Sequence, residues 1–198
     1  MAGIHKKNKH DKIKDTRLEI EKTNIEGCFI LKPRVFKDER GSFFESFNQK
    51  TFEKLTGLKI NFVQDNQSTS TKGVLRGLHF QKGEYAQAKL VRVTRGSVLD
   101  VAVDLRQDSP TLGKHFAIEL NDQNNYQLFV PSGFAHGFIV LSDEAVFNYK
   151  CDNYYHKEAE SGIRYDDFDL EIDWKLKSSE ILLSEKDNIL SNFSELNK

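Results

Sequence analysis

His79 is the residue in this sequence whose surroundings most clearly indicate chemistry. It stands between a leucine and a phenylalanine, where a lone histidine is more commonly a hydrogen-bonded core side chain than a site residue. Arg76 precedes it by three positions, Lys89 lies in the next apolar run, and the polar triplet Gln-Asp-Asn at 64–66 lies in the run before. Burying so many polar groups among apolar strands costs free energy unless they form hydrogen bonds with one another or with a ligand. The pattern therefore predicts a functional site.

The residue types suit the removal of a proton beside a ketone. Such a proton is weakly acidic, so the reaction needs a positioned base and a cation or donor near the oxygen that becomes an enolate. His79 fits the first role and Lys89 fits the second. A histidine base contributes on the order of a hundred- to ten-thousand-fold in rate, and one oxyanion donor contributes about 3 kcal/mol.

A metal centre is the main chemical alternative for a histidine on a β-strand. Metal-binding cupins supply two histidines at His-x-His spacing, a glutamate and a later histidine, whereas this chain reads His-Phe-Gln at 79–81. Glutamine is a poor ligand for Fe, Mn or Zn, so we expect no bound metal. His136, in Phe-Ala-His-Gly-Phe, remains a candidate ligand of a less regular metal site.

Short apolar runs separated by turn signals recur from Gly27 to about residue 151, with no alternation of strands and long helices. This rhythm predicts an all-β fold, a cupin-like jelly-roll barrel or sandwich with short peripheral helices. One helix is expected at 48–55, with Asn48 as its N-cap, and a final short helix within 178–190 that folds back on the barrel.

The run at 97–105 has two different faces. Leu99, Val101, Val103 and Leu105 alternate with Val98, Asp100, Ala102 and Asp104. The fully apolar face should pack the core, which leaves the acidic face toward solvent or toward a ligand cavity. The strand directly follows the one that carries Lys89, and this favours the cavity for both aspartates, Asp100 more strongly.

Composition limits the partners and the location of the chain. With 198 residues and 38% hydrophobic content it can fill one core, and a net charge of −1 provides no basic field for nucleic acid. Cys28 and Cys151 have no CxxC spacing, which favours reduced thiols and a cytoplasmic protein. Residues 1–24 are lysine-rich without an apolar core, so we expect a flexible extension and no membrane anchor, followed by a single domain at 25–198.

Six motifs occur in an order that carries a resemblance to a known family: RVFKDERGSFFESFNQ, FVQDNQS, VLRGLHFQKGEYAQAKLVR, GSVLDVAVDLR, DSPTLGK and VPSGFAHGFIVLS. Together they resemble the dTDP-4-dehydrorhamnose 3,5-epimerase family over about residues 25–190. The resemblance implies a cofactor-free isomerase that converts dTDP-4-dehydro-6-deoxy-D-glucose to dTDP-4-dehydro-L-rhamnose for surface polysaccharides. It also implies a dTDP-sugar ligand and a homodimer.

The resemblance assigns four catalytic positions. The base is the histidine of Gly-Leu-His-Phe-Gln, here His79, and its partner is the aspartate of a Leu-Ser-x-Lys-Asp motif, matched at 183–187 and therefore Asp187. The acid is a tyrosine after the Ala-His-Gly-Phe strand, here Tyr149, and Lys89 lies near the keto oxygen. Without the resemblance, Tyr149 would be read as an ordinary strand aromatic and Asp187 as an acid on a helix surface.

A larger set is implied to bind substrate, with guanidinium groups on phosphate and one tyrosine stacked on the base. The set is Arg40, Glu45, Gln64, Asp65, Asn66, Arg76, Asp100, His136, Tyr155, Glu160 and Lys186. Strict alternation would place Arg76 and His79 on opposite faces of one strand, and a bulge at Gly77 would reconcile them.

Two groups of alternatives remain open. Ala88, Tyr165 and Asp166 replace the glycine, tryptophan and asparagine usual in the family, and these changes at the rim leave the sugar preference open. An enzyme that inverts only C3 or only C5, or that uses another nucleotide sugar, would share the same scaffold. A non-catalytic sugar-nucleotide-binding cupin is disfavoured because His79, Lys89 and Tyr149 are all retained.

Overall fold

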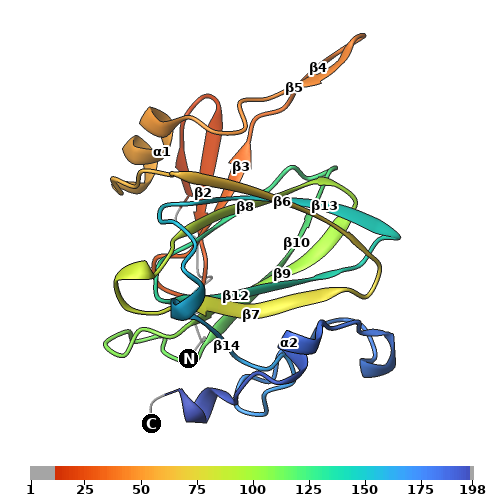
Figure 1. Ribbon diagram of the computed structural model, residues 1–198. Coiled ribbons are helices and arrows are strands. Elements are labelled where there is room, and N and C mark those ends of the chain that lie inside the picture. The colour runs from red at the N-terminus through yellow and green to blue at the C-terminus, as the bar shows by residue number, and fades with distance from the viewer. Residues whose placement is uncertain (1–11, 197–198) are drawn as a thin grey trace, which may run out of the picture.

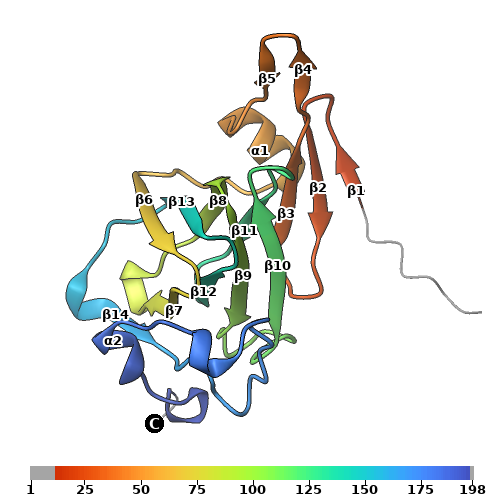
Figure 2. The same ribbon diagram turned by 90° about the vertical axis from the view of Figure 1, so that its right-hand side faces the viewer.

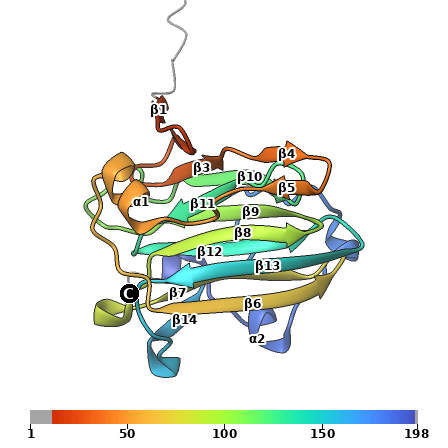
Figure 3. The ribbon, with the colours of Figure 1, turned by 90° about the horizontal axis from the view of Figure 1, so that it is seen from above.

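The computed structural model describes residues 12–196 and consists mainly of two stacked antiparallel β-sheets (Figures 1 and 3). The larger sheet has seven strands in the order β1 (Lys12–Lys14), β2 (Leu18–Lys22), β3 (Phe29–Pro33), β11 (Gln127–Val130), β8 (Lys89–Arg95), β13 (Glu144–Cys151) and β6 (Gln64–Thr71). The smaller has β10 (His115–Asn121), β9 (Ser97–Asp104), β12 (Phe134–Val140), β7 (Leu75–Gln81) and β14 (Glu160–Gly162). The all-β jelly-roll prediction is confirmed, as an open sandwich.

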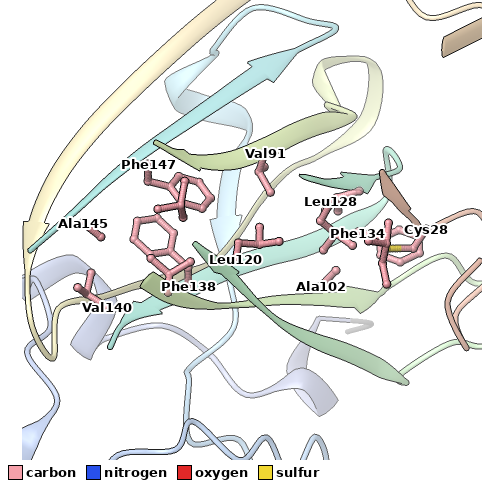
Figure 4. Close-up of a cluster of buried hydrophobic side chains, with 14 of the residues drawn as sticks. Cys28, Val91, Ala102, Leu120, Leu128, Phe134, Phe138, Val140, Ala145 and Phe147 are labelled. Carbon is pink, nitrogen blue, oxygen red and sulfur yellow. The ribbon is translucent and has the colours of Figure 1, made fainter. Parts of the chain in front are cut away.

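The core between the sheets is formed by alternate side chains of both layers (Figure 4). Val91 and Phe147 of the larger sheet meet Ala102 and Phe138 of the smaller one, and the rings of Phe138 and Phe147 are stacked with centroids 4.0 Å apart. Val98 and Ala102 are both fully buried in this cluster. The inner face of β9 is therefore the face that carries the two aspartates.

The opposite face of β9 is buried as well, by the end of the chain. Leu99, Val101 and Val103 pack against residues of the C-terminal segment, including Leu170 and Trp174. Figures 1 and 2 show this segment covering the outside of the smaller sheet. The expectation that the purely apolar face of β9 packs the sandwich core is wrong, because a second layer of chain supplies that face with its own core.

The two predicted helices have different outcomes. Helix α1 (Gln49–Thr56) begins after Asn48, whose side chain accepts a hydrogen bond from the backbone N–H of Thr51, and it buries Phe52 and Leu55 against the larger sheet, as predicted. The predicted C-terminal helix is reduced to a 3₁₀ turn at Ser178–Glu180 and α2 (Glu185–Asn188). Leu182 between them is extended, since its backbone bonds Gly73 and Leu75 beside β7.

The N-terminal boundary also differs from the expectation of a flexible extension at 1–24. Residues 1–11 lie outside the described residues, but β2 pairs along its length with β3. Ile20 is 2% exposed because it packs on the cluster that α1 covers. Glu19 and Glu21 alternate with Leu18 and Ile20, which is the pattern of a strand with one buried face. No helix within residues 12–196 is long and apolar enough to cross a membrane.

Asp104, expected to face the ligand cavity, instead organises the turn after β9. Its carboxylate accepts hydrogen bonds from the side chains of Arg106, Ser109 and Thr111 at 2.5–2.9 Å. Arg106 also donates to the carbonyl of Glu26, so the turn is tied to the N-terminal part of the chain. Burial alone would raise the pKa of Asp104, but these hydrogen bonds outweigh it and lower the pKa to about 2.

We predict that Asp104→Asn lowers the free energy of unfolding by about 2 kcal/mol at pH 7, the equivalent of this pKa shift. Because the folded-state pKa is depressed, the stabilisation is complete above about pH 4 and is lost as the pH falls toward 2. Urea unfolding of both proteins across this pH range measures the difference. The control is Asp173→Asn, at an exposed ion pair. Equal stability of wild type and Asp104→Asn at pH 7 would contradict the assignment.

Candidate active site

A cavity of about 300 Å³ lies between the two sheets near the C-terminal segment. Its lining brings together residues from both sheets and from α2: Gln67, Ser68, Arg76, His79, Lys89, His136, Phe138, Phe147, Tyr149, Ser184, Lys186 and Asp187. A second cavity of about 280 Å³ shares His79, Lys89 and Tyr149 with the first and adds Gln64, Asn66, Phe80, Gln81, Gln87, Tyr155 and Glu160. All four residues to which the family resemblance assigned catalysis therefore lie around one cleft.

His79 and Asp187 are in direct contact, although 108 positions separate them in the chain. Nε2 of His79 lies 2.5 Å from Oδ1 of Asp187, whose side chain is 5% exposed. Ser184 caps α2 by accepting a hydrogen bond from the Asp187 N–H, which orients this short turn. Burial alone would raise the pKa of Asp187, but the hydrogen bond and charge of His79, together with Ser184 and Lys186, outweigh it and hold the pKa below its ordinary value.

A bulge in β7 places Arg76 and His79 on the same side of the sheet. Arg76 pairs with Phe138 and His79 with His136, so β7 uses one residue more than β12 over this interval. Gly77 provides the irregularity with φ +136°, and its Cα approaches β12 so closely that an added Cβ would lie 2.5 Å from the Cα of Gly137. The bulge predicted at Gly77 is present, and both side chains line the cavity.

Lys89 and Tyr149 come from adjacent strands of the larger sheet, on the wall opposite His79. Burial lowers the pKa of the Lys89 ammonium, and the nearby carboxylates of Asp100 and Glu160 act in the opposite direction. Burial raises the pKa of the Tyr149 phenol above its ordinary value. The cleft therefore places a histidine–aspartate pair on one wall and an amine with a protonated phenol on the other.

His136 and Asp100 form a second histidine–aspartate pair next to the first. Nε2 of His136 lies 3.0 and 3.1 Å from the two carboxylate oxygens of Asp100, and His136 is the register partner of His79 in the neighbouring strand. Asp100 is fully buried, while His136 lines the cavity. Of the two aspartates expected at the cavity, Asp100 thus lies behind His136, and Asp104 belongs to the turn described above.

The second cavity gathers most of the remaining substrate-binding candidates. The Tyr155 hydroxyl donates to Glu160 Oε2 at 2.8 Å, and Lys186 of α2 forms an ion pair with Oε1 of the same carboxylate. Gln64 and Asn66 lie on the facing strand β6. This arrangement links β14, α2 and the loop before β14 at one end of the cleft.

Three substrate-binding candidates lie away from the cleft in this chain. Arg40 is in the turn of the hairpin formed by β4 (Phe36–Asp38) and β5 (Gly41–Phe43), paired with Asp38, and Figure 1 shows this hairpin projecting from the body. Glu45 pairs with Arg17 at 3.2 Å. Asp65 points to the outer face of the larger sheet, where it pairs with Lys150.

Several cavity residues were not identified from the sequence: Gln67, Ser68, Phe138, Phe147 and Ser184. Ser68 had a usable signal, since it shares a face of β6 with Asn66. The phenylalanines had none, because an aromatic at a cavity wall looks like any core aromatic in sequence. The Gln81 side chain holds two neighbouring loops in place, because it donates hydrogen bonds to the carbonyls of Tyr85 and Tyr154. Within residues 12–196 no three His, Cys, Asp or Glu side chains are grouped for a metal ion.

We predict that Gly77→Ala both destabilises the fold and lowers activity, because the new methyl group meets the backbone of Gly137 and the required φ is unsuitable for alanine. A loss of about 3 kcal/mol or more in the free energy of unfolding is expected. Gly83→Ala is the matched control. Its φ is +60° and nothing lies within 4 Å of an added Cβ, so it should cost only about 1 kcal/mol. Denaturant unfolding that gives equal losses for the two variants would refute the close approach.

Comparison with known proteins identifies the family of this chain. The family model described as dTDP-4-dehydrorhamnose 3,5-epimerase matches residues 22–195. The Escherichia coli K12 protein of that name is 54% identical over 179 residues, which cover 90% of this chain and 96% of that protein.

Solved structures show the same likeness. The epimerase of Elizabethkingia anophelis superposes with a TM-score of 0.89 at 54% identity, covering 92% of this chain and all of that one. A Legionella pneumophila enzyme, solved in complex with dTDP-4-keto-L-rhamnose, gives a TM-score of 0.87 at 47% identity, covering 90% of this chain and 94% of that one. The chain therefore belongs to the dTDP-4-dehydrorhamnose 3,5-epimerase family.

Proposed function

We infer that this protein is a dTDP-4-dehydrorhamnose 3,5-epimerase, an isomerase that converts dTDP-4-dehydro-6-deoxy-D-glucose to dTDP-4-dehydro-L-rhamnose. The observation that carries the inference is the His79–Asp187 pair facing Lys89 and Tyr149 across one cleft. Family membership supports the substrate, and the side chains account for the chemistry. Proton removal and return need a base, an acid and an oxyanion donor, so the proposal includes no cofactor.

Proton removal, the first half of the reaction, is carried out by the histidine–aspartate pair on the wall formed by β7. A carboxylate only accepts hydrogen bonds, so its contact places the proton of neutral His79 on Nε2 and leaves Nδ1 as the nitrogen that takes a proton from the sugar. Asp187 stabilises the imidazolium that results. The Lys89 ammonium donates to the C4 oxygen as negative charge develops on it, an interaction that strengthens in the transition state.

The second half belongs to the opposite wall. Inversion requires that the proton return from the face away from the base, and Tyr149 is carried by the other sheet. Its raised pKa keeps the phenol protonated at neutral pH, ready to donate. C3 and C5 both neighbour the C4 carbonyl, so the same pair can serve each carbon in turn.

Inversion of a single carbon is the second candidate function. A 3'-monoepimerase from Streptomyces bikiniensis shares this fold, with a TM-score of 0.82 at 30% identity over 88% of each chain. The common scaffold supports chemistry at one carbon as well as at two. The higher identity to the 3,5-epimerases favours inversion of both carbons here.

We predict that wild-type, chelator-treated protein incorporates deuterium at both C3 and C5 of the keto sugar nucleotide in heavy water, followed by NMR. His79→Ala should lose exchange at both carbons, by at least a hundred-fold, while still binding dTDP. Gln107→Ala, outside the cleft, is the control. Exchange at only one carbon in the wild type would favour the monoepimerase, and wild-type exchange in His79→Ala would remove this residue from its role.

We further propose a cytoplasmic homodimer in which the hairpin β4–β5 reaches the cleft of the second copy. Phe43 and Phe36 on this hairpin are 70% and 44% exposed, which is costly for a projecting hairpin in water and reasonable for one that meets a partner. Arg40 and Glu45 would then contact the nucleotide in the partner's cleft, where an arginine suits the diphosphate. Cys28 and Cys151 are buried and unpaired with each other, which suits a reducing compartment.

Mixed dimers test this arrangement. Arg40→Ala should raise KM at least ten-fold, because a charged hydrogen bond to phosphate is lost. A purified heterodimer of one Arg40→Ala and one His79→Ala subunit contains one cleft with both residues if the hairpin crosses over. At substrate concentrations well below the wild-type KM it should then recover about half of the wild-type rate per dimer, whereas each homodimer stays at about a tenth of that rate or less. A heterodimer no more active than the two homodimers would show that Arg40 does not act across the interface.

A further inference from the structure

Ser68 lines the catalytic cavity and carries a buried hydroxyl without a hydrogen-bond partner in the described part of the chain. Its Oγ is buried and has no hydrogen-bond partner among residues 12–196, a property that it shares there only with Nδ1 of His156. Ser68 lines the cavity that contains His79 and Tyr149. A buried hydroxyl without a partner is costly, so such an atom beside a ligand site calls for an explanation.

The neighbouring side chains on the same face of β6 do have partners. Asn66 contacts the thiol of Cys151, and Ser70 accepts a hydrogen bond from Nε of Arg76 at 3.1 Å. Ser70 therefore orients a guanidinium group that also lines the cavity. Ser68 lies between these two, at the same spacing along the strand.

The protein wall around Ser68 has little to offer its hydroxyl. Its register partner on β13 is Phe147, whose ring is stacked on Phe138, and both rings line the same cavity. Aromatic rings provide no strong acceptor or donor for a serine. A hydrogen-bond partner for this hydroxyl would therefore have to come from a molecule bound in the cavity.

The position within the cleft indicates which part of a sugar nucleotide is near. Ser68 lines the cavity with Lys89, His136 and the histidine–aspartate pair, but not the second cavity with Tyr155 and Glu160. The first cavity holds all the groups that act on the sugar ring. A sugar hydroxyl both donates and accepts hydrogen bonds, and so does serine.

We propose that the Ser68 hydroxyl forms a hydrogen bond with a ring hydroxyl of the bound sugar and positions the sugar between His79 and Tyr149. The proposal rests on the function inferred above, and it adds a residue that holds the substrate without taking part in proton transfer. Loss of such a neutral hydrogen bond weakens binding about three- to ten-fold.

The test compares Ser68→Ala with wild type by calorimetry, using dTDP and the stable sugar nucleotide dTDP-glucose as ligands. We expect dTDP-glucose to bind about three- to ten-fold more weakly and dTDP to bind unchanged. The KM for the keto sugar should rise in parallel. Thermal unfolding should occur at the wild-type temperature or above, because a buried polar atom without a protein partner has been removed. Thr69→Ala, on the exposed face of the same strand, is the matched control.

Three results would overturn the proposal. Unchanged affinity for both ligands would mean that the bound sugar does not contact the hydroxyl. An equal loss for dTDP and dTDP-glucose would place the contact on the diphosphate beside Arg76. A lower unfolding temperature with unchanged affinities would show a purely structural role. Ser68→Cys, which keeps the size of the side chain with a weaker donor, provides a second variant. Epimerisation by the wild-type protein is measured separately, so failure of the inferred epimerase function can be distinguished from failure of the Ser68 proposal.

Discussion

The contact between His79 and Asp187 depends on how the end of the chain lies against the sandwich. Asp187 reaches the cleft only because the C-terminal segment runs back across β7, held by backbone bonds around Leu182 and by the packing of Trp174. A single turn of helix, capped by Ser184, then directs the carboxylate at the imidazole. The same segment buries the outer face of the smaller sheet, so folding and the proposed chemistry share one set of contacts.

The sandwich separates the two halves of the inferred reaction. The proposed base lies on the smaller sheet and the proposed acid, Tyr149, on the larger, so the spacing of the sheets provides opposite faces for one sugar ring. Strands of the two layers must diverge enough to leave a cavity, and they close again over Phe138 and Phe147. A rigid β-scaffold suits this task because small displacements of catalytic groups are costly to rate.

Local sequence was sufficient where the determining contacts are local. Asn48 was predicted to cap α1, because its partner lies three residues away, and the irregularity at Gly77 followed from the need to place Arg76 and His79 together. Prediction was wrong for the faces of β9, because alternation shows that two faces differ but not that a distant segment covers one of them. The same limitation applies to β2, whose charged residues concealed a strand with one buried face.

Taken alone, the sequence determined the all-β class, most strands, the family resemblance and the identity of His79 as a residue with unusual neighbours. Only the tertiary structure decided which polar residues meet. It placed Asp100 behind His136, used Asp104 to organise a turn, and left Arg40 on a projecting hairpin; the contact of Asp187 with His79 had been implied by the resemblance alone. The physical reason is that a side chain's function depends on neighbours distant in the chain, whose approach follows from packing both faces of each sheet.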